Sequence, residues 1–376
     1  MVAQDAVDAT FEQLTAVSKP EEIIDEARHG RMFLLVDDAA RENEGDLVIA
    51  GQFATPDAIN FMVTEDRGLV CLSLTERRVR QLGLEPMVAG NRTRHGTAFT
   101  VSIEAREGVS TGISAYDRAR TVSAAIDPDA TPDSLVSPGH VFPLAARDGG
   151  VLVRAGHTEA GVDIARLAGL IPAAVICEVM RPDGTMARLP DLIALAQRHG
   201  LKIGTIADLI AFRLRNDRTI RLVRSEEAMS AKGNRVVTSV YENGVDGAEH
   251  CAMVVGDVAG DRPVLVRMHR VSVMDDLIVP AQQSVPGMLQ KAFDAVDAEG
   301  RGVVVVFRDL QPDTLRRTRV TSDQRDGGPA TIRDYGVGAQ ILHDLGVQNL
   351  KLLSRTSVLP AGLEGFGLHI CGTQGL

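Results

Sequence analysis

The chain has 376 residues, of which 44% are hydrophobic and 24% charged, so its length predicts two domains and its composition is typical of a globular protein. Its net charge of -10 argues against binding to nucleic acid or to a membrane surface, because either would need a basic face. The chain also lacks Trp and has only 3% aromatic residues, so stacking on nucleic-acid bases is not expected. It has neither a basic, apolar signal segment nor a run of about 18 apolar residues, so we expect a cytoplasmic protein.

Helices and strands alternate through the first 215 residues. Ser18-Lys19-Pro20-Glu21 predicts the start of a helix that ends at Gly30, before an apolar strand at 32–36. The pattern then predicts, in chain order, a helix at 55–68, strands at 69–74 and 97–105, a helix at 114–125, a proline- and acid-rich stretch at 127–138, a strand at 151–153, a helix at 158–168, a strand at 173–180, and helices at 190–199 and from 205. This alternation predicts an α/β (α+β) domain with a mixed sheet over residues 1–215.

The second part of the chain, residues 216–376, predicts a second α/β domain. Residues 213–224 carry many charges and few large apolar side chains, which marks the end of the first domain. Strands are then predicted at 235–241, 251–255, 263–268 and 302–307, with helices at 286–298 and 337–345.

The segment between Val36 and Asp46 is unusually acidic. Its charged residues are Asp37, Asp38, Arg41, Glu42, Glu44 and Asp46. They begin where the strand at 32–36 leaves the core, and carboxylates this close raise one another's pKa unless a cation compensates them. A hard divalent ion bound by oxygen ligands would do so, whereas a solvated acidic loop is the alternative that this segment alone leaves open.

A second group of candidate residues surrounds the predicted start of the helix at 158. Free N–H groups at a helix N-terminus and a nearby arginine are suited to phosphate, so Arg154 and Thr158 could bind one, with Thr158 as the helix cap. His157 lies between them and could ligate a metal, although a lone histidine at a helix start is more often a capping or surface residue.

Three further features point to chemistry. His140 follows Pro138-Gly139, a predicted tight turn that would fix the imidazole at a strand edge for proton transfer. Glu178 lies within an apolar strand, where a buried carboxylate is costly unless it is protonated or partnered, which favours a functional role. The hydroxyl-rich loop at 108–118, which contains Thr111, could bind an oxyanion or could simply cap the next helix.

Seven ordered motifs together resemble the 3,4-dihydroxy-2-butanone 4-phosphate synthase family of riboflavin biosynthesis. They lie at 37–46, 94–100, 110–118, 138–142, 154–160, 176–178 and 183–188. The resemblance covers residues 18–215 and implies a dimeric α/β lyase that uses Mg²⁺ or Mn²⁺. The implied reaction converts D-ribulose 5-phosphate to L-3,4-dihydroxy-2-butanone 4-phosphate and formate, by metal-assisted enolisation, dehydration, skeletal rearrangement and loss of C4.

The resemblance also implies roles for single residues. Glu42 and His157 match the metal ligands, and His140 and Glu178 match positions needed for catalysis. The implied substrate contacts are Arg41, Glu42, Asp46, Thr111, Arg154, Ala155, Gly156, His157, Thr158 and Glu178. Glu44 is a candidate for handling protons, whereas Asp37 and Asp38 are expected only to mark the end of the strand.

Residues 234–376 resemble GTP cyclohydrolase II, but they depart from the pattern of that family at three places. The stretch 270–286, where the family has three zinc-binding cysteines, contains none, and the four cysteines of the chain (Cys71, Cys177, Cys251 and Cys371) form no CxxC pair. The place of the Glu-Gly-Arg-Gly motif reads Asp309-Leu-Gln-Pro-Asp-Thr314, and Thr331 stands where an acid is expected before Arg333. We therefore expect a retained fold without zinc or cyclohydrolase activity. The alternatives are a bifunctional enzyme and a phosphosugar-binding regulator.

Overall fold

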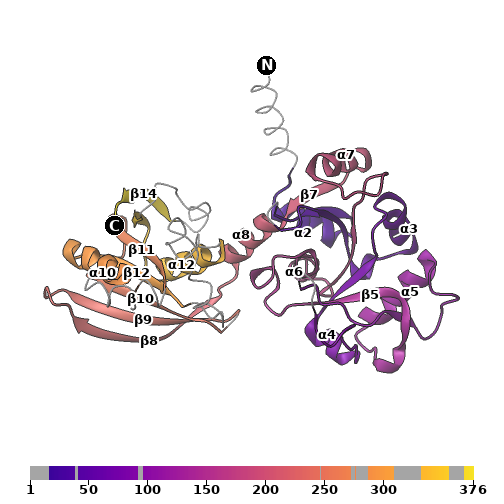
Figure 1. Ribbon diagram of the computed structural model, residues 1–376, viewed down its shortest axis with the longest axis horizontal. Coiled ribbons are helices and arrows are strands. Elements are labelled where there is room, and N and C mark those ends of the chain that lie inside the picture. Colours follow the sequence, from indigo (N-terminus) through magenta and orange to yellow (C-terminus); the bar gives the residue numbers. More distant parts are fainter. Residues whose placement is uncertain are drawn as a thin grey trace, which may run out of the picture. The chain divides into compact units, whose positions relative to one another are not determined.

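The computed structural model describes residues 17–38, 41–91, 96–245, 247–271, 276, 287–308, 332–354 and 368–376, and of residues 332–335 it describes the backbone alone. The chain divides into two compact units, Met1–Ile210 and Ala211–Leu376, and each contains a seven-stranded mixed sheet (Figure 1). The sequence predicts the domain boundary after residue 215, whereas in the structure the first unit ends at Ile210. None of the helices in the described ranges is long and apolar enough to cross a membrane.

The sheet of the first unit has the strand order β4-β5-β3-β6-β2-β1-β7. Its strands are β1 (Phe33–Val36), β2 (Gly45–Ala50), β3 (Cys71–Thr75), β4 (Ile103–Ala105), β5 (Leu135–Ala146), β6 (Ala173–Glu178) and β7 (Lys202–Thr205). The pairs β1/β7 and β3/β5 are parallel, whereas β2 runs antiparallel to both β1 and β6. The acidic segment therefore connects two adjacent strands in the interior of the sheet.

Helices cover both faces of this sheet (Figure 1). They are α2 (Pro20–Arg28), α3 (Pro56–Glu65), α4 (Glu76–Gln81), α5 (Ala115–Ile126), α6 (His157–Leu167), α7 (Leu189–His199) and α8 (Ile206–Asn216), with 3-10 turns at Gly51–Phe53, Pro132–Ser134 and Gly150–Leu152. Helices α3, α5 and α7 pack on alternate strand residues such as Leu34 and Leu47, while α6 packs along β2, β3 and β6. This alternation explains why β1 and β2 are buried throughout.

Helix starts were predicted well where a side chain caps the helix. Thr55 caps α3 and Ser114 caps α5, each accepting a backbone N–H, and the Thr205 hydroxyl accepts the N–H of Asp208 at 3.0 Å. At α2 the cap position falls on Lys19 rather than Ser18.

Several predicted elements of the first unit are wrong. The strand expected at 151–153 is part of a 3-10 turn, because Gly149 and Gly150 both have positive φ and the Asp163 carboxylate accepts the N–H of Val151 at 2.8 Å. The strand expected at 97–105 shrinks to β4, and the proline- and acid-rich stretch at 127–138, for which no element was predicted, contains the start of β5.

The second unit has the strand order β14-β13-β11-β12-β10-β9-β8. Its elements are β8 (Ile220–Met229), β9 (Arg235–Asn243), β10 (Glu249–Val255), β11 (Val264–Arg270), α10 (Met288–Glu299), β12 (Gly302–Phe307), α12 (Ile332–Asp344), β13 (Asn349–Leu353) and β14 (His369–Gln374). The core lies between the Val-rich strands and the two helices. The edge strand β8 was not predicted because, apart from Ile220, its residues are exposed and give no apolar alternation.

Candidate active site

Asp37 anchors the acidic loop between β1 and β2. Its buried carboxylate accepts hydrogen bonds from Arg41 Nη1 at 2.9 Å and from the backbone N–H groups of Glu42 at 3.1 Å and Glu44 at 2.8 Å. The expectation that Asp37 only ends the strand is therefore wrong. Arg41 also contacts the Glu42 carboxylate at 2.6 Å, so one guanidinium bridges two acids.

Strand pairing brings two more acids to this place. Asp46 on β2 stands opposite Glu178 on β6. Burial, reinforced by the negative charges of Glu178, Glu42 and Glu44, raises the pKa of Asp46 well above its ordinary value. Asp46 is only 4% exposed, whereas Glu42, Glu44 and Glu178 are half-buried, so Asp46 is the most deeply buried of these acids.

His157 completes this cluster as the first residue of α6. It is 6% exposed, and its Nδ1 lies 3.7 Å from Asp46 Oδ1. Burial lowers the pKa of His157 to about 4, so the imidazole is neutral at pH 7. Its Nε2 is buried without a hydrogen-bond partner in the described structure.

A neutral imidazole with a free nitrogen, next to crowded carboxylates, suits a divalent cation. Within the described residues, no three His, Cys, Asp or Glu side chains are grouped as a complete set of ligands. A site formed by Glu42 and His157 alone would leave positions for water or substrate, which is how Mg²⁺ is commonly bound. The residues therefore fit such an ion.

Glu178 lies at the end of β6, half-buried, and not within the core of the strand as predicted. Its Oε2 accepts the backbone N–H of Leu69 at 3.0 Å. The chain at Gly68 passes so close to Glu178 that a Cβ there would lie 2.1 Å from the Glu178 carbonyl oxygen. The turn before β3 thus fixes the position of this carboxylate.

Beneath the same turn lies Asp66, which sequence reasoning missed. It is 0% exposed, and neither carboxylate oxygen has a hydrogen-bond partner within the described ranges. Burial raises its pKa to about 8. Its carbonyl accepts the N–H of Met180 at 2.8 Å, which ties this residue to the chain that follows Glu178.

The start of α6 differs from the prediction. Gly156 is the N-cap residue, and no side chain caps the helix, so Thr158 lies buried in the first turn. Arg154 donates to Glu159 at 2.6 Å and to the Thr97 hydroxyl at 3.0 Å. Ala155, half-buried, connects Arg154 to this cap. Arg154 therefore lies beside a helix N-terminus that no side chain occupies.

His140 and the Thr111 loop form a second cluster around Glu104. His140 is not in a tight turn but in a bulge of β5, where the pairing partners shift from Ile103/Val141 to Glu104/Val136. Its Nδ1 lies 3.3 Å from Glu104 Oε1. Gly112, next to the exposed Thr111, has φ +88°, and a Cβ there would lie 1.1 Å from the same oxygen.

The structure thus brings the predicted residues together in two clusters. Glu42, Glu44, Asp46, His157 and Glu178 influence one another's charge, as the directions of the pKa shifts show. Among the described residues, no hydrogen bond joins His140 to these acids. The sequence analysis did not name Glu104 and Arg188 as site residues. Glu104 lies in the strand predicted at 97–105, and Arg188 ends the motif at 183–188. Arg94 and His95 lie outside the described residues.

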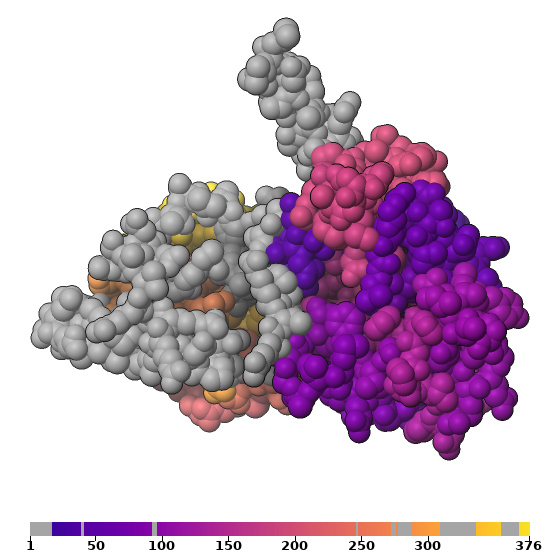
Figure 2. Space-filling model, turned by 45° about the vertical axis from the view of Figure 1, so that its right-hand side comes forward, coloured from indigo at the N-terminus to yellow at the C-terminus, as the bar shows by residue number. Residues whose placement is uncertain are grey.

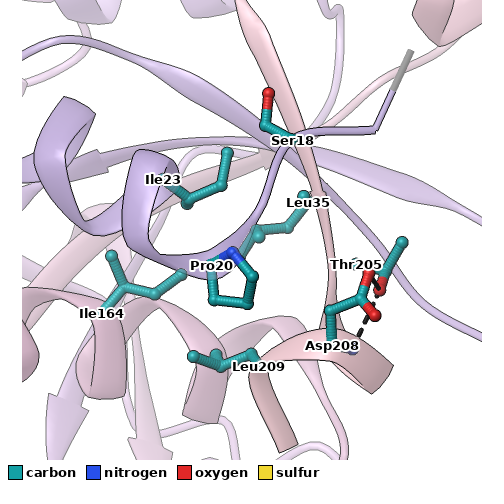
Figure 3. Close-up of a pocket in the computed structure, with 9 residues that line it drawn as sticks. Ser18, Pro20, Ile23, Leu35, Ile164, Thr205, Asp208 and Leu209 are labelled. Atoms are coloured by element: carbon teal, nitrogen blue, oxygen red, sulfur yellow. Dashed lines mark hydrogen bonds between the residues drawn. The ribbon is translucent and has the colours of Figure 1, made fainter. Parts of the chain in front are cut away.

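A pocket between α2, α6 and α8 is separate from these clusters (Figure 3). Its walls are mainly apolar, with the hydrogen-bonded pair Thr205 and Asp208 at one side. The cavity measures about 10 Å³, which is room for roughly one water molecule. It cannot hold a sugar phosphate.

In the second unit, His269 at the end of β11 lies 2.9 Å from the Asp276 carboxylate. Asp276 also accepts the N–H of Leu289 at 3.0 Å, in the first turn of α10. Most of the stretch 270–286, the segment 309–314, Thr331 and the side chain of Arg333 lie outside the described residues.

Comparison with known proteins agrees with this division. Residues 21–212 match the family model of 3,4-dihydroxy-2-butanone 4-phosphate synthase, and residues 221–374 match that of GTP cyclohydrolase II. A 3,4-dihydroxy-2-butanone 4-phosphate synthase of Pseudomonas syringae pv. tomato is 50% identical over 363 residues, covering 94% of this chain and 98% of that protein.

Two solved structures are also similar. RibBX of A. baumannii, described as a two-domain 3,4-dihydroxy-2-butanone 4-phosphate synthase, has a TM-score of 0.79 and 42% identity, covering 95% of this chain and 99% of that one. A 3,4-dihydroxy-2-butanone 4-phosphate synthase in complex with two magnesium ions has a TM-score of 0.52 and 42% identity, covering 53% of this chain and 98% of that one.

Proposed function

The chain belongs to the 3,4-dihydroxy-2-butanone 4-phosphate synthase family and is a lyase of riboflavin biosynthesis, and from this premise we propose which residues convert D-ribulose 5-phosphate to L-3,4-dihydroxy-2-butanone 4-phosphate and formate. The cluster formed by the buried Asp46 and His157, with the half-buried Glu178 opposite Asp46, supports the proposal most directly. The cluster brings together carboxyl groups and an imidazole that differ in acid strength. Successive proton transfers require such a set of groups.

Glu42 and His157 would hold Mg²⁺ or Mn²⁺. The orphaned Nε2 of His157 and the acids that raise the pKa of Asp46 are the observations that favour this pair. A divalent ion bound there would polarise adjacent substrate oxygens and acidify the neighbouring C–H bond. The solved relative with two magnesium ions is consistent with divalent metal use.

The other residues would bind the substrate and move protons. Arg154, with the backbone N–H groups of His157 and Thr158 in the first turn of α6, would hold the phosphate. Burial raises the pKa of Asp46 well above its ordinary value, which favours the protonated form, and in that form Asp46 would donate a hydrogen bond to a substrate oxygen, while Arg41 would contact another. Glu178 and His140 would transfer the protons of enolisation and dehydration, with Thr111 beside the substrate.

Release of formate tests this proposal. Purified chain with Mg²⁺ and ribulose 5-phosphate is expected to release formate, and Glu42→Gln is expected to lower kcat/KM by roughly 100-fold or more. Binding without turnover in the unaltered chain would instead support a phosphosugar-binding regulator.

For the second unit we propose a retained fold without bound zinc and without cyclohydrolase activity. The absence of cysteine from 270–286 supports this, because the family holds zinc with three thiolates in that stretch. The match of residues 221–374 to the GTP cyclohydrolase II model keeps a bifunctional enzyme as the alternative. Metal analysis of the purified chain should find no stoichiometric zinc, and incubation with GTP should release no pyrophosphate. Zinc together with GTP turnover would establish the bifunctional enzyme.

A homodimer in the cytoplasm, without nucleic acid or membrane partners, completes the proposal. Light scattering on the purified chain measures the first of these, since a dimer of this 376-residue chain has twice the mass of the monomer.

A further inference from the structure

Arg188, at the N-cap position of α7, contacts the acidic loop from the far end of the first unit's sequence. Its Nη1 donates to the carbonyl oxygen of Glu42 at 2.9 Å and also to the carbonyl oxygen of Asn43. Asn43 has φ +55°, in the left-handed region, so the loop bends sharply immediately after Glu42. One guanidinium therefore fixes the two peptide units that follow the Glu42 side chain.

The charge of Arg188 also belongs to this cluster. Burial and the charge of Glu42 raise the pKa of Glu44, and the Arg188 guanidinium opposes that rise. Arg41 compensates Asp37 and Glu42 on the other side of the loop. The loop thus keeps its carboxylates together with two arginines, one from within the loop and one from α7.

Arg188 is itself held in place. Its backbone N–H donates to Asp191 at 2.9 Å, and Asp191 also accepts two hydrogen bonds from Arg181, at 2.9 and 2.6 Å. Further along α7, Leu192 packs so tightly on Gly45 that a Cβ there would lie 2.3 Å from its side chain. Figure 2 shows the pink surface around α7 against the indigo and violet surface of the first hundred residues.

We propose that Arg188 is a positioning residue that holds the acidic loop in the shape in which Glu42 binds the divalent ion. The inference rests on the proposed assignment of Glu42 as a metal ligand. In this role Arg188 would act through the carbonyl oxygens of Glu42 and Asn43 rather than by contact with the substrate or the ion. Its contribution is preorganisation, because without it the loop must be ordered when the ion binds.

The experiment is titration of the full-length chain with Mn²⁺, followed by the electron paramagnetic resonance signal of the free ion. Arg188→Met is expected to raise the Kd for Mn²⁺ by about tenfold or more, the size of effect typical of residues that orient metal ligands. Activity measured at rising Mn²⁺ should recover most of its kcat, since the reacting groups are unchanged. Arg188→Lys should give an intermediate Kd, because an ammonium group can still donate to carbonyl oxygens.

Arg198→Met is the matched control, because Arg198 is exposed in the last turn of the same helix. It should bind Mn²⁺ as the unaltered chain does. Wild-type Mn²⁺ affinity in a folded Arg188→Met variant would overturn the inference, and so would wild-type affinity in both Arg188→Lys and Arg188→Gln should the methionine variant fail to fold.

A separate variant distinguishes this failure from failure of the proposed function. Glu42→Gln should abolish tight Mn²⁺ binding if Glu42 is a ligand. Retained binding in Glu42→Gln would overturn the ligand assignment and, with it, the present inference. Lost binding in Glu42→Gln, combined with unchanged binding in Arg188→Met, would overturn the role of Arg188 alone.

Discussion

Glu104 shows how a single carboxylate can connect two parts of the candidate site. It approaches His140 at 3.3 Å, is 15% exposed at its side chain, and leaves no room for a side chain at position 112. An imidazole that is itself 43% exposed would otherwise rotate freely in the β5 bulge. The pair therefore orients the ring and keeps the Thr111 loop beside it.

Replacing Glu104 with Gln is expected to lower kcat about tenfold, while KM changes little, because the ring loses its orienting charge but not its neighbours. Steady-state kinetics over a range of ribulose 5-phosphate concentrations measure both kcat and KM. Glu107→Gln, exposed in the adjoining loop, should behave as the unaltered enzyme; an equal loss in the two variants would count against the pair.

The buried Asp66 should make the free energy of unfolding depend on pH. Its folded-state pKa of about 8 lies above the ordinary value of 3.8, so the folded chain binds the additional proton between these values. The free energy of unfolding therefore falls as pH rises from about 4 to 8. Asp66→Asn removes the titration, and at pH 8 it should be more stable than the unaltered chain by about 1–3 kcal/mol.

Urea unfolding followed by circular dichroism at pH 5 and pH 8 checks this. The two chains should differ less at pH 5 than at pH 8, because at pH 5 the folded chain still holds Asp66 protonated. A variant that is less stable at pH 8 would show that the carboxylate is stabilised by a partner.

At the scale of elements, sequence predicted best what depends on local chemistry. The capped helices α3 and α5 and the apolar strands β1 and β12 follow from a side chain at the cap or from a run of Val and Leu. Strand β5 could not be found this way, because its first residues are exposed and contain Pro138 and Gly139, which break the alternation. Its pairing with β3 and β4 supplies what local propensity lacks.

The same distinction applies to the site. The sequence singled out the acids, His157 and His140 as candidates by residue type and motif. It could not show that Asp37 is an anchor or that Arg188 reaches the loop, because both facts depend on contacts made after folding. Glu178 was placed correctly in a strand but wrongly in its core, since the length of β6 sets its exposure.

The bulge in β5 supplies a further prediction. A Cβ on Gly139 would lie 2.1 Å from the carbonyl carbon and oxygen of Ile103, so Gly139→Ala must push β5 away from β4. We expect at least a tenfold loss of formate release with little change in the circular dichroism spectrum, because His140 is displaced while the remaining strands stay paired. Gly90→Ala, where a Cβ meets no atom within 4 Å, is the control. Unchanged activity in Gly139→Ala would mean that the position of His140 is not critical.

At the scale of the whole molecule, each unit has its own hydrophobic core. The two cores share no residue, so we expect calorimetry to resolve two unfolding transitions. Mn²⁺ at about 100 times its Kd should stabilise only the first unit. Its free energy of unfolding should rise by roughly 2.7 kcal/mol, and its Tm by several degrees.

In Glu42→Gln the Mn²⁺-dependent rise should vanish while both transitions remain. A rise shared equally by the two transitions would indicate that the units unfold together.

The register of β2 has a consequence for how this chain can tolerate change in length. Asp46 meets Glu178 because β2 holds one alignment against both β1 and β6, and a slip by one residue would put Leu47 in its place on the opposite face. The loop would not tolerate a deletion, because the Asp37 carboxylate at its start accepts hydrogen bonds from the backbone N–H groups of Glu42 and Glu44 further along. Removing a single residue between positions 37 and 46 is therefore expected to abolish catalytic activity, even if every acid named above is kept.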